Sequence, residues 1–96
     1  MESSMVKFII SYLNKNIKEY ILIKSNSYGS FWDIEFEYKE IKVKISGDIG
    51  FSISLFIEDN VYDLSQYDRT VINHMETSKE NLLIQLDILK DFLSNI

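Results

Sequence analysis

Apolar and charged side chains alternate over residues 32–45, and this alternation limits the fold more than any other feature of the chain. The alternating apolar positions are Trp32, Ile34, Phe36, Tyr38, Ile41, Val43 and Ile45. Side chains two residues apart lie on the same face of a β-strand, so the pattern predicts two half-buried strands. A short loop at residues 39–40 sets Tyr38 opposite Ile41 and puts all of these apolar side chains on one face.

The charged positions between them agree with the same register. Glu37 is then opposite Lys42, and Glu35 is opposite Lys44. Opposite charges directly across an antiparallel pair stabilise it by roughly 0.2–1 kcal/mol each. These four residues are therefore expected to form a solvated face whose charges balance without a partner.

The alternation continues beyond this hairpin. Residues 51–57 keep their apolar side chains on the same face if the turn at residues 47–50 gives a loop of three or five residues. A turn at residues 59–60 then leads into a short strand over residues 61–64. In that strand Tyr62 and Leu64 face the core, whereas Asp63 faces solvent. Residues 65–76 have no clear period and are expected to form a loop.

Two segments have the three- and four-residue spacing of amphipathic helices. Residues 4–20 form the first, with Ser3 or Ser4 as its N-cap and a turn at residues 26–30 beyond it, although residues 20–24 also suit a short strand. Thr77 and Glu80 form a capping box that opens the second helix. The expected fold is α+β with a single two-layer domain over residues 1–96. An antiparallel meander of four to five strands is covered on one face by an N-terminal and a C-terminal helix.

Composition supports a folded domain and indicates the cellular compartment in which the protein is found. Hydrophobic residues make up 46% of the 96 residues, which is enough for one core. There is no cysteine, so disulfides and thiolate chemistry are excluded, which fits a reducing cytoplasm. Neither a signal peptide nor a run of about 20 apolar residues is present. We therefore expect a cytoplasmic protein without membrane association.

The net charge of −5 belongs entirely to the second half of the chain. Residues 1–50 carry seven acids and seven lysines, whereas residues 51–96 carry eight acids and three basic residues. Binding to nucleic acid or to anionic lipid needs clusters of lysine and arginine, so neither partner is expected. A partner with a basic surface is favoured instead.

The acids of residues 58–68 lack the lysine partners that the hairpin has. Tyrosine is enriched at protein interfaces, and an exposed apolar side chain beside unpaired acids also indicates one. The candidate partner-binding residues are Phe56, Glu58, Asp59, Asp63, Tyr67 and Asp68. The alternative is that these acids only keep a loop soluble.

No residue set for catalysis or for metal binding stands out in the sequence. His74 is the only histidine, and no nucleophile elbow, phosphate-binding glycine loop or HExxH motif accompanies it. Asp59, Asn60 and Asp63 lack the glycine and the distal glutamate of a calcium loop. We therefore expect no enzyme activity, no catalytic residue, no metal and no cofactor.

Two segments give the chain a family likeness: FSISLFIEDNVYDLSQYD (residues 51–68) and ENLLIQLDILKDFL (residues 80–93). With its small size and acidic α+β character, the chain resembles the immunity proteins of bacterial polymorphic-toxin and contact-dependent growth inhibition systems. The resemblance implies a cytoplasmic, non-catalytic inhibitor that binds one cognate toxin domain, often a nuclease, and blocks its active site. Two other classes stay open. One is a homodimeric structural or regulatory domain that uses Phe56, Val61 and the sheet face on itself; the other, least favoured, is an enzyme with a pocket at His74 or the acids.

Overall fold

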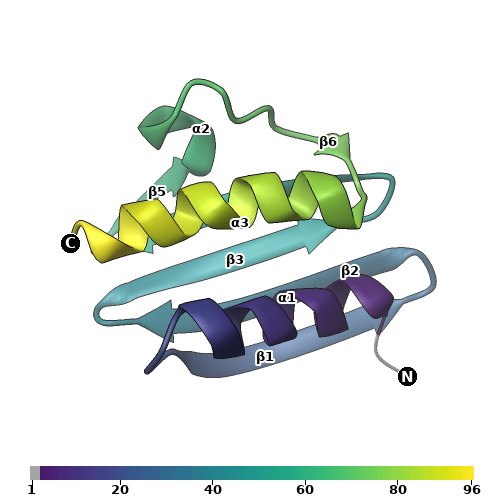
Figure 1. The fold of residues 1–96 in the computed structure, drawn as a ribbon, viewed down its shortest axis with the longest axis horizontal. Helices are drawn as coiled ribbons and strands as arrows, with labels where there is room; N and C mark the ends of the chain where they lie inside the picture. The colour runs from purple at the N-terminus through teal and green to yellow at the C-terminus, as the bar shows by residue number, and fades with distance from the viewer. Residues whose placement is uncertain (1–2) are drawn as a thin grey trace.

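The computed structural model describes residues 3–96, which form an antiparallel sheet with two long helices on one of its faces (Figure 1). In chain order the elements are α1 (Ser4–Asn16), β1 (Ile21–Tyr28), β2 (Phe31–Tyr38), β3 (Ile41–Gly47), β4 (Gly50–Ile57), β5 (Asn60–Asp63), α2 (Leu64–Tyr67), β6 (Met75–Glu76) and α3 (Lys79–Ser94). The sheet order is β1-β2-β3-β4-β5, and the short β6 pairs with the start of β4. Each of the first five strands therefore lies beside its neighbour in the chain. The predicted α+β meander is confirmed.

The register of the central hairpin is the one that the sequence predicts. Tyr38 is paired with Ile41, and Glu37 is paired with Lys42. Between β3 and β4, Gly47 is paired with Phe51, so the loop has three residues. This loop length keeps the apolar residues of β4 on the face that β2 and β3 bury.

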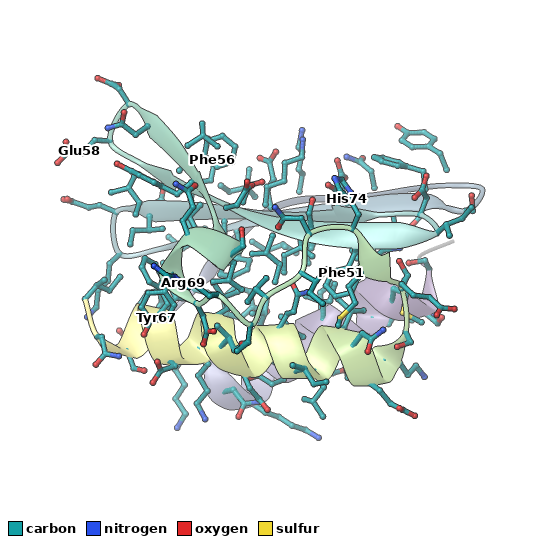
Figure 2. All side chains as sticks on the ribbon, turned by 90° about the horizontal axis from the view of Figure 1, so that it is seen from above. Phe51, Phe56, Glu58, Tyr67, Arg69 and His74 are labelled. Carbon is teal, nitrogen blue, oxygen red and sulfur yellow. The ribbon has the colours of Figure 1, made fainter. Side chains whose placement is uncertain are left out.

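The core fills the space between the sheet and the layer formed by α1 and α3. Its strand residues, all nearly inaccessible to solvent, include Trp32, Ile34, Phe36, Val43, Ile45, Phe51, Ile53 and Leu55. The fully buried helix residues that meet them include Ile9, Leu13, Leu86 and Leu89. The Tyr12 hydroxyl donates a hydrogen bond to Asp87 Oδ1 at 2.6 Å, which joins α1 directly to α3. Within residues 3–96 no helix lies on the other face of the sheet, which is open (Figure 2).

The first helix and the first strand have different limits from those predicted. α1 ends at Asn16 rather than at residue 20, because Ile17 takes an extended conformation with φ −127° and ψ 90°. β1 includes residues 26–28, which the sequence assigns to a turn, and the turn itself is at residues 29–30. The reason is long-range, since residues 21–28 pair with β2 and this pairing outweighs the local helical period.

The segment predicted as a loop over residues 65–76 contains two short elements, α2 and β6. Leu64 is fully buried, as expected, but it is the first residue of α2 and does not belong to a strand. Tyr62 is paired with Leu55 and so lies on the helix side of the sheet. Its side chain is nevertheless 38% exposed, because β5 is the edge of the sheet.

The cap of the last helix also differs from the prediction. Ser78 is the N-cap of α3, and its side-chain oxygen accepts a hydrogen bond from the Asn81 backbone N–H at 3.1 Å. Thr77 lies one residue too early, because its backbone N–H donates to the Ile49 carbonyl at 2.8 Å. This bond keeps Thr77 in line with β6. The predicted capping box of Thr77 and Glu80 is therefore wrong, although the C-terminal helix that it predicted is present as α3.

Candidate protein-binding surface

The six candidate partner-binding residues lie on two different faces of the molecule. Phe56 is on the open face of the sheet, where it is paired with Lys42 on one side and with Val61 on the other. Tyr67 is on α2, across the sheet from Phe56, and packs against α3 (Figure 2). The structure thus divides the predicted site, because the sheet separates its two aromatic members.

Glu58 and Asp59 form the two-residue turn between β4 and β5, where Ile57 is paired with Asn60. Both side chains are exposed, and Glu58 has a φ of 56°, in the left-handed region. Turns favour aspartate for conformational reasons, whereas a positive φ is uncommon for a glutamate. Their place at the tip of a hairpin also leaves both carboxylates accessible from either side of the sheet.

Asp63 and Asp68 have local structural roles at the two ends of α2. Asp63 is the N-cap residue, and its backbone N–H donates to Gln66 Oε1 at 2.8 Å. Asp68 Oδ1 accepts two hydrogen bonds from Thr70, one from the hydroxyl at 2.6 Å and one from the backbone N–H at 2.9 Å. These bonds stabilise the carboxylate and lower the pKa of Asp68. Capping and turn formation therefore account for part of the acidity of this segment.

Tyr67 is held in place by α3. Its hydroxyl donates to Asp91 Oδ2 at 2.6 Å, and its ring meets that of Phe92 edge-on with 4.9 Å between centroids. The hydrogen bond to Asp91 is the main reason why the pKa of Tyr67 is raised. An aromatic pair in this geometry is stabilising beyond the area it buries. The exposed Tyr67 side chain is therefore an ordered feature of the surface.

A shallow apolar hollow of about 260 Å³ opens between β4, β5, α2 and α3. We call it the tyrosine hollow; it is lined by Leu55, Ile57, Tyr62, Asp63, Gln66, Tyr67 and Phe92. Most of its wall is apolar, and Asp63 places a carboxylate in the lining. Asp91 adds a second carboxylate through its hydrogen bond to Tyr67. This arrangement can accept an apolar side chain that has a positive charge beside it.

Sequence reasoning missed the residues that α3 contributes to the tyrosine hollow. Phe92 and Asp91 are 24 or 25 residues away from Tyr67 along the chain, and only the docking of α3 on the sheet brings them together. The helical period marks Phe92 as part of the core stripe, and it is in fact only half-buried. One signal was present, since Asp87 and Asp91 are spaced by one helical turn and so share a face of α3.

The open face of the sheet has less unbalanced charge. Lys24 Nζ is 3.6 Å from Glu35 Oε1, so Glu35 pairs with β1 as well as facing Lys44 on β3. Asp33 is buried on this face and accepts a hydrogen bond from Asn26 Nδ2 at 2.9 Å. Opposite charges that pair on this face leave less net charge there for a partner to meet.

His74 and the acids do not come together in residues 3–96. The exposed His74 has a φ of 63°, and its backbone N–H donates to the Phe51 carbonyl at 2.9 Å, which aligns β6 with β4. Among the described residues no group of three or more His, Asp or Glu side chains is arranged to hold a metal ion. None of the helices in this part of the chain is both long and apolar enough to cross a membrane.

Comparison with protein families, with curated proteins and with solved structures finds no match to this chain. The interpretation of the surface therefore depends on its geometry and charge.

Proposed function

We propose that this protein is a non-catalytic inhibitor that binds and neutralises a cognate bacterial toxin domain through the tyrosine hollow and the acids around it. The supporting observation is the hollow itself, in which ordered aromatic side chains lie beside the carboxylates of Asp63 and Asp91. Interfaces are commonly held by a few aromatic anchors in a desolvated centre, with charged residues at the rim.

The charge distribution favours a basic partner such as a nuclease. All of the net charge of −5 is in residues 51–96, which include β5, α2 and α3. The substrate groove of a nuclease is basic because it holds phosphates, so an acidic surface is attracted to it and speeds encounter. An inhibitor that covers such a groove needs no catalytic group of its own.

A second candidate function, a homodimeric structural or regulatory domain, has one observation in its favour. Val61 is 60% exposed beside the half-buried Phe56 on the open face. A symmetric contact through this face would bury both side chains. The mass of the protein in solution as a function of concentration separates this function from the first.

The experiment for the toxin-inhibitor function measures binding to the toxin domain encoded by the adjacent reading frame, at two salt concentrations. Asp59→Lys is expected to slow association roughly threefold to tenfold and to reduce its salt dependence, because Asp59 is an exposed rim charge. Glu37→Lys makes the same change of charge on the open face and is the control. Equal effects of the two would mean that only the overall charge matters.

Two variants, each of which replaces a tyrosine with alanine, test the role of the tyrosine hollow. Tyr62→Ala is expected to weaken toxin binding about tenfold or more, mainly through faster dissociation, because it removes a wall of the hollow. Tyr28→Ala truncates an exposed tyrosine at the β1–β2 turn and is expected to leave binding unchanged. A toxin bound equally well by Tyr62→Ala and by the parent protein contradicts this location of the site.

A further inference from the structure

β5 is an edge strand whose outer side is open. The sheet order ends at β5, and the strand is paired with β4 on one side only. Edge strands present unpaired backbone groups that can pair with a strand of another chain. The edge next to the tyrosine hollow is therefore a place where a partner's backbone can bind.

The direction of the backbone groups on β5 follows from one hydrogen bond. The Asp63 N–H donates to the side chain of Gln66, so it points away from β4. Alternate residues of an antiparallel strand direct their backbone groups to the same side, so the N–H and C=O of Val61 point to the open edge as well. Within residues 3–96 these two groups of Val61 have no hydrogen-bond partner.

Both faces of the sheet carry accessible apolar side chains at this edge. Val61 is 60% exposed on the open face, next to Phe56. Tyr62 is 38% exposed on the helix side, where it lines the tyrosine hollow. Side chains of an added strand would point alternately to these two faces. Such a strand would contact both parts of the predicted site, which the sheet otherwise separates.

Acidic side chains lie at both ends of the edge. Glu58 and Asp59 are at the turn that precedes β5, and Asp63 ends the strand. Residues 58–69 contain four acids and one basic residue, Arg69, and α3 has no basic residue in its last turn, where the helix dipole is negative. The charges at this edge therefore complement a basic segment.

We propose that β5 accepts an extended, basic segment of the partner protein as an additional antiparallel strand. The identity of the partner rests on the proposed function. The mode of binding rests on the open edge of β5. Every strand pair described in this sheet is antiparallel. In that arrangement one residue of the segment exchanges two backbone hydrogen bonds with Val61. The residue that precedes it in the segment lies opposite Tyr62, on the side of the tyrosine hollow. Flanking lysine or arginine residues then meet the acids at each end.

The test uses the whole protein and a synthetic hexapeptide, acetyl-Lys-Lys-Phe-Val-Lys-Lys-amide, with binding followed by amide chemical shifts in NMR. Shifts are expected at residues 56–63 and at Tyr67 and Phe92. Methylating the amide nitrogen of the peptide's valine should weaken binding about tenfold, because that N–H faces Val61. Methylating the amide nitrogen of its phenylalanine should have little effect, because that N–H points away from β5.

The two methylated peptides have the same charge, mass and side chains, and the protein is unchanged, so folding cannot explain a difference between them. Equal losses from both methylations would overturn strand addition, as would shifts confined to the outer face of α3 or no saturable binding at millimolar peptide. Replacing the four lysines with glutamates should abolish the shifts, and binding that survives would overturn the charge argument.

The peptide experiment tests strand addition to β5 independently of the experiment that tests toxin binding. If the toxin domain binds as proposed but the methylated peptides do not differ, strand addition is wrong and the inhibitor function stands. If the peptides differ but no toxin binds, the partner is wrong and the binding edge stands.

Discussion

At the scale of single residues, two tyrosines from different helices donate hydrogen bonds to α3. Tyr12 of α1 donates to Asp87, and Tyr67 of α2 donates to Asp91, each at 2.6 Å. The two aspartates are one helical turn apart, so one face of α3 receives both bonds. The settings differ, because Tyr12 is 7% exposed whereas Tyr67 is 41% exposed. The inner pair therefore contributes to stability, and the outer one orients a surface ring.

Alkaline unfolding should reveal the Tyr12 bond. Burial, and then the hydrogen bond to Asp87, raise the pKa of Tyr12 above its ordinary value of about 10. The stabilisation is therefore fully present below pH 10 and is lost as the pH rises beyond it. Tyr12→Phe should lower the free energy of unfolding by about 1–2 kcal/mol at pH 7 and flatten its decline above pH 10. Urea titrations monitored by circular dichroism at several pH values measure both effects.

Tyr28→Phe is the control for this prediction, because Tyr28 is 70% exposed. It should leave the unfolding free energy and its alkaline decline unchanged. A Tyr12→Phe protein whose stability falls above pH 10 as steeply as that of the parent would show that another group is responsible.

At the scale of elements, the strands could be predicted from the sequence more fully than the segments between them. In β2 and β3 the apolar period and the charge period agree, and together they fix the register of Glu37 with Lys42. α2 and β6 have no such period. They depend on distant partners, since β6 exists because His74 and Thr77 bond to the backbone around β4. The predicted end of α1 is wrong for the same reason: the residues after it pair with the distant strand β2, and the sequence period does not show this.

Gln85 binds the segment between α2 and α3 to the core through a hydrogen bond of its side-chain amide. A variant without the amide tests this role. Gln85 is 2% exposed, and its Nε2 donates to the Ile72 carbonyl at 3.1 Å. Gln85→Met fills similar volume without that bond, so amide exchange at His74 and Thr77 should speed up about tenfold. Global stability should change little, since Gln85 Oε1 is a buried oxygen without a partner among the described residues and its loss offsets part of the cost. Equal acceleration of exchange across the whole sheet would contradict a local role.

At the scale of the whole molecule, one core joins both helices to the sheet. Phe36 and Leu86 are fully buried on its opposite layers. Phe36→Ala should cost about 3–5 kcal/mol and Leu86→Ala about 2–5 kcal/mol through loss of transfer energy and cavity formation. Both variants should unfold in a single transition seen alike by Trp32 fluorescence and by far-ultraviolet circular dichroism. Transitions that separate in either variant would mean that α3 melts independently of the sheet.

The candidate site belongs to this largest scale, which is why the sequence shows only part of it. The acids of residues 58–68 are visible in the sequence, and Tyr67, a candidate named from the sequence, lines the tyrosine hollow. Phe92 and Asp91 join it only through the packing of α3, and the sheet places Phe56 on the far side. The spacing of Asp87 and Asp91 places both on one face of α3, but it does not predict that Tyr67, 24 residues before Asp91, contacts that face.

The contact between α1 and α3 also has a consequence for the order in which the protein is made. Tyr12 and Asp87 are 75 residues apart, so the ribosome must translate the entire sheet before the two helices can meet. At roughly 5–20 residues per second, the nascent chain spends some seconds with its strands made and α3 not yet available to cover them. In that interval the tyrosine hollow lacks its Phe92 wall. The candidate binding surface is therefore complete only once residues 79–94 have emerged.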